Sequence, residues 1–139
     1  MLLKDMEPIV KKFYEGLEEG VYYARKCQEC GAVEFPPHLA CNTCGYHGTE
    51  WVEVSGHGKL LNFTIPGIQN DKPHLKEHGK YGYGTVELDE GCQYTFVVYG
   101  LSKKKAADVR AKIMAGETVG VHAKTIDRPQ YKELVFELD

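Results

Sequence analysis

Four of the five cysteines fall in two C-x-x-C pairs that are separated by ten residues. Thiolates on two such tight turns match the tetrahedral coordination of Zn²⁺, whereas the cysteines of iron–sulfur sites usually have more compact or more asymmetric spacings. Gly31 and Gly45 directly follow the second cysteine of each pair, where a knuckle turn tends to need a positive φ. The predicted zinc ligands are Cys27, Cys30, Cys41 and Cys44. Because four thiolates leave no vacant position for water, we predict a structural rather than a catalytic zinc ion.

For the remaining candidate residues, a packing or solvent-exposed role is favoured over a catalytic or binding role. Cys92 stands outside the pairs, and a small, partly buried thiol is favoured there over a nucleophile. His74 and His78, with Lys72, Lys76 and Lys80 around them, form the only compact His/Lys group, for which a solvated loop is favoured over an anion site. We find no Ser-His-Asp order, phosphate-binding glycine loop or supported carboxylate pair, so the sequence predicts no catalytic residue.

Composition and charge limit the classes of protein to which this sequence can belong. Hydrophobic residues make up 42% and charged residues 27% of the 139 residues, which is an ordinary globular balance. The net charge is −3, and the stretch from Cys27 to Gly58 has no Lys or Arg but four glutamates, so binding of nucleic acid by the ribbon is disfavoured. The start, MLLKDMEPIV, resembles neither a signal peptide nor a membrane span. We therefore expect a cytoplasmic protein, whose reducing surroundings favour metal over disulfides.

The pattern of apolar residues predicts a mainly β protein. Residues 5–17 have helical spacing, with Asp5 available as N-cap, and this amphipathic helix must dock either on its own domain or on another subunit. Five strands are predicted at 57–65, 83–89, 93–100, 118–126 and 132–138. Glu90-Gly91-Cys92 suits a hairpin turn between the second and third strands.

A second predicted helix, at 102–115, separates strands three and four. Ser102 can cap it, and Gly116 marks its end. The resulting order is that of a five-stranded OB-fold barrel. Lys103, Lys104 and Lys105 fall in the first turn of this helix, where a solvated face is favoured over an anion-facing patch. We predict two domains, with the helix and zinc ribbon at 1–50 and the OB-fold domain at 51–139.

Two features of the barrel sequence leave a binding role open. The segment 66–82 is too polar for a strand, and loops of this length are often functional, so it is the first candidate for ligand or partner contact. OB-fold surfaces also use aromatic rings to stack bases, although strand alternation implies that at least half of these rings are core residues. The rings in question are Phe63, Tyr81, Tyr83, Tyr94, Phe96 and Tyr99. A single-stranded nucleic-acid-binding module is therefore the alternative function.

Several motifs together are more specific than the cysteines alone. They are FYEGLEEG at 13–20, CQECG at 27–31, FPPHLACNTCG at 35–45, Trp51, SGHGKL at 55–60 and YGTVELDEG at 83–91. Over nearly its whole length the chain resembles the acyl-CoA-associated zinc-ribbon plus OB-fold family, whose members are accessory subunits of thiolases and related enzymes.

The resemblance implies both a fold and a function. It implies an N-terminal helix, a rubredoxin-like zinc ribbon and an OB barrel, in a non-catalytic subunit of a hetero-oligomeric acyltransferase complex. The catalytic Cys and His would belong to a thiolase-family partner, which would also bind most of the CoA thioester. This chain would scaffold the partner and help to shape its acyl-CoA site.

Overall fold

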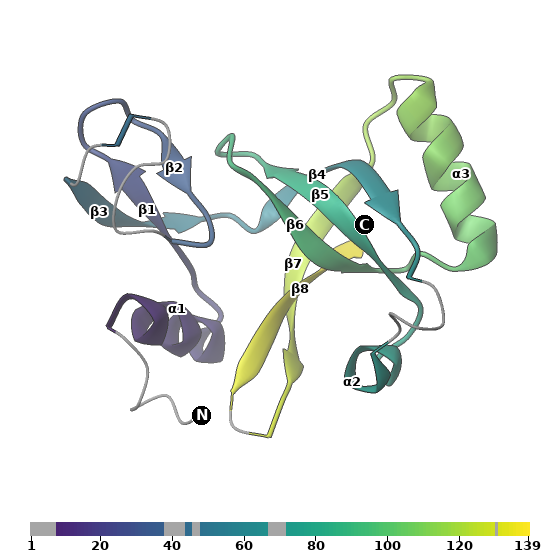
Figure 1. Cartoon of the computed structure of the whole chain (residues 1–139), viewed down its shortest axis with the longest axis horizontal. Helices are drawn as coiled ribbons and strands as arrows, with labels where there is room; N and C mark the ends of the chain where they lie inside the picture. Colours follow the sequence, from purple (N-terminus) through teal and green to yellow (C-terminus); the bar gives the residue numbers. More distant parts are fainter. Residues whose placement is uncertain (1–7, 38–43, 46–47, 67–71, 130) are drawn as a thin grey trace.

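The computed structural model describes residues 8–37, 44–45, 48–66, 72–129 and 131–139. In chain order the elements are α1 (Pro8–Glu19), β1 (Tyr22–Cys27), β2 (Val33–Glu34), β3 (Thr49–Val54), β4 (His57–Thr64), α2 (Pro73–Lys76), β5 (Tyr81–Leu88), β6 (Gln93–Tyr99), α3 (Lys103–Met114), β7 (Gly120–Asp127) and β8 (Lys132–Leu138). Strands β2, β1 and β3 form a small sheet beside α1, and the other five strands close into a barrel, with α3 at the opposite end of the molecule (Figure 1).

The barrel has the order β4-β5-β6-β8-β7. Its neighbouring strands are antiparallel except β6 and β8, which run parallel. The third and fifth barrel strands thus lie side by side, and α3 lies between the third and fourth strands in the chain, as predicted for an OB fold. Gly91 has φ +95° in the turn that joins β5 to β6, which confirms the predicted hairpin.

The segment 66–82 is more ordered than its polar sequence indicates. Pro73 begins the four-residue helix α2, since the fixed φ of proline suits a first helical position. Leu75 anchors this helix because its side chain is buried and its carbonyl accepts a 2.6 Å hydrogen bond from the Tyr99 hydroxyl. Tyr81 and Gly82 already belong to β5. The prediction of an irregular loop was therefore wrong for 73–76 and 81–82, while 67–71 lie outside the described residues.

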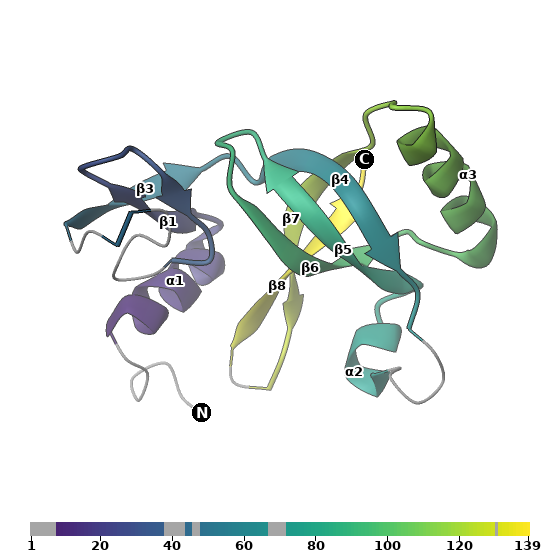
Figure 2. The same ribbon diagram turned by 45° about the horizontal axis from the view of Figure 1, so that its top comes forward.

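Helix α1 packs against its own chain. Phe13 and Leu17 are buried, and the helix contacts β1 and β8 (Figure 2). Gly20, with φ +77°, ends the helix in the left-handed conformation that glycine adopts easily. Asp5 lies outside the described residues. The structure thus favours docking of the apolar stripe of this helix on its own chain over docking on another subunit.

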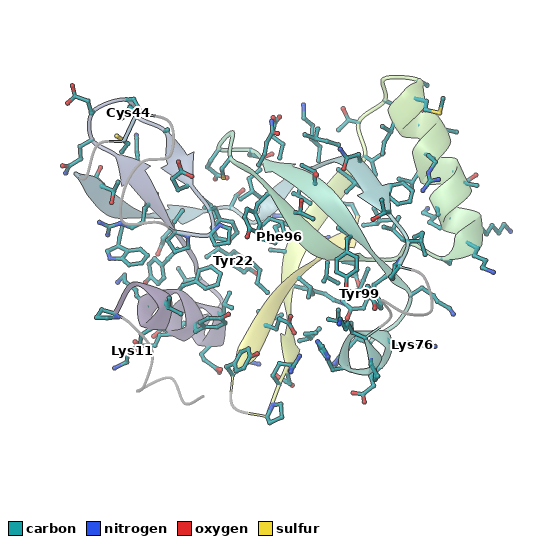
Figure 3. All side chains as sticks on the ribbon, in the orientation of Figure 1. Lys11, Tyr22, Cys44, Lys76, Phe96 and Tyr99 are labelled. Atoms are coloured by element: carbon teal, nitrogen blue, oxygen red, sulfur yellow. The ribbon has the colours of Figure 1, made fainter. Side chains whose placement is uncertain are left out.

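A row of phenylalanine rings joins the helix, the ribbon and the barrel. Phe35, which follows β2, has its ring centre 5.7 Å from that of Phe13 and 6.0 Å from that of Phe96. Phe96 in turn lies 4.7 Å from Phe136 inside the barrel. Figure 3 shows Phe96 on the side of the barrel that faces the small sheet. These buried rings belong to one continuous core.

The small sheet extends across the predicted domain boundary. Strand β3 runs from Thr49 to Val54 and pairs with β1 over its whole length, so residues 51–54 continue the ribbon sheet. Trp51 on this strand lies under the Arg25 guanidinium, whose carbon is 4.7 Å from the ring centre. The division into 1–50 and 51–139 stays a prediction.

Helix α3 begins and ends where the sequence indicates. The Ser102 side chain accepts a 3.2 Å hydrogen bond from the Lys105 backbone N–H, and Gly116 beyond the helix end has φ +78°. Ala106 and Val109 face the barrel and are buried. Within the part of the chain that the structure describes, no helix is both long enough and apolar enough to cross a membrane.

Candidate metal centre

Of the ribbon cysteines that the structure describes, Cys27 and Cys30 lie at the turn after β1, and Cys44 lies before β3. Cys27 is the last residue of β1, and its N–H donates to the Ala32 carbonyl at 2.8 Å. The Gly31 N–H donates to the Cys27 carbonyl at 3.0 Å, which closes the turn that contains Cys30. Gly31 and Gly45 both have φ +77°, as expected for the residue after each knuckle. The local sequence thus folds the chain back so that the cysteine side chains meet.

The described cysteines of the ribbon form one cluster. The Sγ atoms of Cys27, Cys30 and Cys44 all lie within 4.8 Å of one another, and those of Cys27 and Cys44 are 3.6 Å apart. Two sulfurs bound tetrahedrally to Zn²⁺ at about 2.3 Å would lie about 3.8 Å apart, so the spacing fits a metal of this size. Cys41, the fourth predicted ligand, lies outside the described residues. The three thiols form a group that can hold a metal ion.

The surroundings of Cys27 favour its thiolate. The Cys30 backbone N–H donates to the Cys27 Sγ at 3.4 Å, and this hydrogen bond is the largest cause that holds the pKa of Cys27 below its ordinary value. Metals bind the deprotonated sulfur, so a backbone donor aimed at the ligand atom is the kind of outer contact that metal sites use. The donor set and the turn geometry therefore both fit zinc.

Cys92 has the opposite environment. Burial raises the pKa of its thiol to about 11, and the carboxylates of Glu90 and Glu34 add to the shift. Its side chain is only partly exposed and packs against the main core. A thiol that stays protonated near neutral pH is a poor nucleophile, which supports the packing role predicted from the sequence.

The histidines do not form a catalytic group among the described residues. His122 on β7 pairs with Asp139 at 2.8 Å and with Glu137 at 3.5 Å, a surface ion-pair group that the sequence pattern did not reveal. His74 on α2 lies 3.9 Å from Glu133, while His57 begins β4 and is exposed. His38 and His47 lie outside the described residues.

The barrel aromatics are mainly structural. Of the six rings considered for base stacking, Phe63, Tyr81, Phe96 and Tyr99 are buried. Tyr94 alone among these six is a large exposed side chain, at 50%. Stacking of single-stranded bases needs a row of accessible rings, which this surface does not provide. The observation disfavours the nucleic-acid alternative.

Comparison with known proteins identifies relatives of this chain. The chain is similar to DUF35 domain-containing scaffold proteins. It is 32% identical over 71 residues to one from Methanothermobacter thermautotrophicus, covering 50% of this chain and 52% of the relative. Over 96 residues it is 27% identical to one from Methanocaldococcus jannaschii, covering 68% and 65%. The matches thus span between about half and two thirds of these relatives' lengths. No protein-family model matches the chain.

Solved structures show the same fold over almost the whole chain. A chain of the Ltp2-ChsH2(DUF35) aldolase superposes with a TM-score of 0.65 at 18% identity, covering 96% of this chain and 97% of that one. A DUF35-family protein of unknown function from Sulfolobus solfataricus gives a TM-score of 0.57 at 20% identity, covering 96% and 87%. At these identities the likeness concerns the fold alone.

Proposed function

We propose that this chain is a DUF35-type, non-catalytic zinc-binding subunit that scaffolds a thiolase-type enzyme and helps to shape its acyl-CoA site. The observation that carries the proposal is the end-to-end structural match to a chain of an aldolase named for two components, Ltp2 and the DUF35 protein ChsH2. The scaffold-protein names of the sequence relatives support the same role. Catalysis would then reside in the partner, which would supply the reactive Cys and His.

The proposed zinc ligands are Cys27, Cys30, Cys41 and Cys44. When bound, zinc would cross-link the two knuckle turns, and the four thiolates would leave it no open position for chemistry. Metal binding of this kind is coupled to folding, so loss of a ligand should lower both metal content and stability. The described side chains would hold the ion between the end of β1 and the turn at Cys44.

Replacing single cysteines tests the zinc assignment. We expect Cys41→Ser and Cys44→Ser to reduce zinc, measured by mass spectrometry of the purified protein, from one ion per chain and to lower the melting temperature. Cys92→Ser is the matched control, since Cys92 lies outside the cluster, and it should keep full zinc. Full occupancy and unchanged melting in Cys41→Ser would refute the assignment.

The finer proposal names the reaction. In size and layout the chain resembles the small subunit of benzoylsuccinyl-CoA thiolase, an enzyme of anaerobic toluene degradation. The partner would be a cytoplasmic thiolase that cleaves a carbon–carbon bond beside the thioester and binds most of the CoA. This chain would contribute architecture and part of the substrate channel.

Co-expression tests the partnership directly. The chain should co-elute in size-exclusion chromatography with a thiolase-like protein encoded by a neighbouring gene, and it should show no thiolysis of acyl-CoA by itself. The partner should gain activity or stability when this chain is added. Elution of the two proteins as separate species at micromolar concentrations would reject the proposal.

A further inference from the structure

Two histidines face each other across the barrel seam between β4 and β7. His57 and His122 are direct partners in this antiparallel pair, so their side chains leave the same face of the sheet. In the adjacent pair the Ala123 N–H donates to the Gly56 carbonyl at 2.7 Å. Because hydrogen-bonded and non-hydrogen-bonded pairs alternate along an antiparallel ladder, His57 and His122 form a non-hydrogen-bonded pair, in which α-carbons lie about 4.5 Å apart. Two imidazoles at this spacing can reach one metal ion.

Carboxylates surround the His122 ring. Its Nδ1 lies 2.8 Å from the Asp139 Oδ1, and its Nε2 lies 3.5 Å from the Glu137 Oε1. Lys124 pairs with Glu137 at 2.7 Å, whereas Asp139 has no Lys or Arg partner among the described residues. A Cβ at Gly120 would collide with the Asp139 carboxylate, so glycine at this position leaves room for that carboxylate beside His122. Asp139 is thus the carboxylate best placed to join the two histidines.

A further carboxylate lies on the other side of His57. The Asp89 N–H donates to the His57 carbonyl at 3.0 Å, which extends the β4–β5 register by one pair. His57 and Asp89 are both exposed, so the His57 ring can turn toward His122 without displacing a core side chain. Histidines that bind metals commonly have a carboxylate beside them as an outer contact. Each histidine of the pair has such a neighbour.

Ion pairing alone does not account for the facing histidines. The carboxylates explain the position of His122, but they do not explain a second histidine directly opposite it. Two imidazoles gain little from each other and repel when both are protonated, as like charges do at directly opposite positions in a sheet. A shared metal ion reverses this relation, because it binds both rings in their neutral form. Imidazole and carboxylate ligands together suit zinc and similar transition metals, whereas Mg²⁺ and Ca²⁺ prefer oxygen ligands alone.

We propose that His57, His122 and Asp139 bind a divalent transition-metal ion of the zinc class on the outer surface of the barrel, in addition to the ion proposed for the ribbon. Water would complete its coordination, since these residues supply three ligands. The ion would join β4 to β7, which pair through three residue pairs, and would fasten the barrel just after the chain leaves the ribbon. The site uses none of the ribbon cysteines and does not depend on the proposed scaffold function.

Metal analysis of the full-length, zinc-loaded chain tests the site. After dialysis against micromolar free zinc, mass spectrometry should find one zinc ion more per chain in the unaltered protein than in His57→Gln or His122→Gln. Each replacement should weaken this ion at least about tenfold, because even outer contacts of metal ligands change metal affinity by about 10–100-fold. His74→Gln is the matched control and should keep the ion, since His74 also lies near a carboxylate, that of Glu133 at 3.9 Å, but on α2.

A second measurement follows the fastening of the seam. Zinc added beyond the ribbon ion should raise the melting temperature of the unaltered chain, and this rise should be absent in His122→Gln and smaller in Asp139→Asn. Added Mg²⁺ should leave the melting temperature unchanged. Melting of each variant before zinc is added shows that folding is intact. The same zinc count in His57→Gln as in the unaltered chain, or an equal loss in His74→Gln, would overturn the site.

Discussion

Replacing Phe35 tests whether the ribbon, α1 and the barrel are held together by one core. Its side chain is 3% exposed, and its ring lies between those of Phe13 and Phe96. Phe35→Ala therefore removes a buried ring at the junction of α1, the ribbon and the barrel. The change leaves every proposed zinc ligand in place.

The expected loss follows from this burial. Truncation of a buried phenylalanine to alanine costs about 3–5 kcal/mol of unfolding free energy. For a chain of this length, each kcal/mol corresponds to about 3 °C, so we expect the melting temperature to fall by about 10–15 °C. Tyr94→Ala is the matched control, since that ring also contacts Phe96, at 5.3 Å, but is half exposed. It should cost less than about 1 kcal/mol.

Two probes separate the ribbon from the barrel in urea unfolding. Trp51, the only tryptophan, reports on β3 by its fluorescence, and far-UV circular dichroism reports on the helices and strands of the whole chain, most of which belong to the barrel and α3. The two transitions should coincide in the unaltered protein because the core is shared. In Phe35→Ala the fluorescence transition should come at lower urea than the dichroism transition. A cost below about 1 kcal/mol, or separate transitions already in the unaltered protein, would refute the shared core.

Three further predictions concern single side chains. Ser102→Ala should lower the unfolding free energy by about 1 kcal/mol in thermal melts, since it removes the cap that accepts from the Lys105 N–H, whereas Ser102→Thr should retain most of it. Cys92 should react slowly with iodoacetamide at pH 8 and faster as the pH approaches its pKa of about 11, as followed by mass spectrometry; fast labelling at pH 8 would contradict its burial. The hydrogen bond from Lys124 holds the pKa of Glu137 below its ordinary value of 4.5. The stabilisation of the folded state by this interaction is therefore present above pH 4.5 and is lost as the pH falls further. Glu137→Gln should therefore flatten the dependence of stability on pH below 5, measured by urea unfolding at pH 3–7.

Local sequence patterns predicted the elements that are stabilised by interactions between residues close together in the chain. The alternation of apolar residues in β4 to β8 and the Ser102 cap of α3 depend on residues that are neighbours in the chain. The predicted bounds of these strands and of α3 lie within about two residues of the observed ones. Helix α2 was missed because four residues have no periodicity, and its stability depends on Leu75 packing beneath Tyr99, 24 positions away. The contact of Phe35 with Phe96 is equally non-local. The sequence alone therefore does not reveal that the ribbon and the barrel share a core, because the contact forms only in the closed barrel.

The same reasoning explains the outcome for the cysteines and for the lysines. The C-x-x-C spacing specifies a metal cluster locally, and Cys27, Cys30 and Cys44 do meet. From the sequence we also considered the lysines near His74 and Lys103, but we interpreted them as two separate groups exposed to solvent. Hydrogen bonding of β5 between β4 and β6 brings both groups to one cavity, and no spacing rule could have joined them.

The distribution of charge gives the molecule two unlike ends. Glu29, Glu50 and Glu53 are exposed on the ribbon, whereas the exposed lysines around the cavity lie at the opposite end of the barrel. Charges on a protein surface are screened beyond about 8 Å at physiological ionic strength, so the acidic ribbon and these lysines act independently of each other. The zinc ribbon proposed here would act through the core that it shares with the barrel, because the Phe35 ring packs against Phe96 and fixes the small sheet to the barrel.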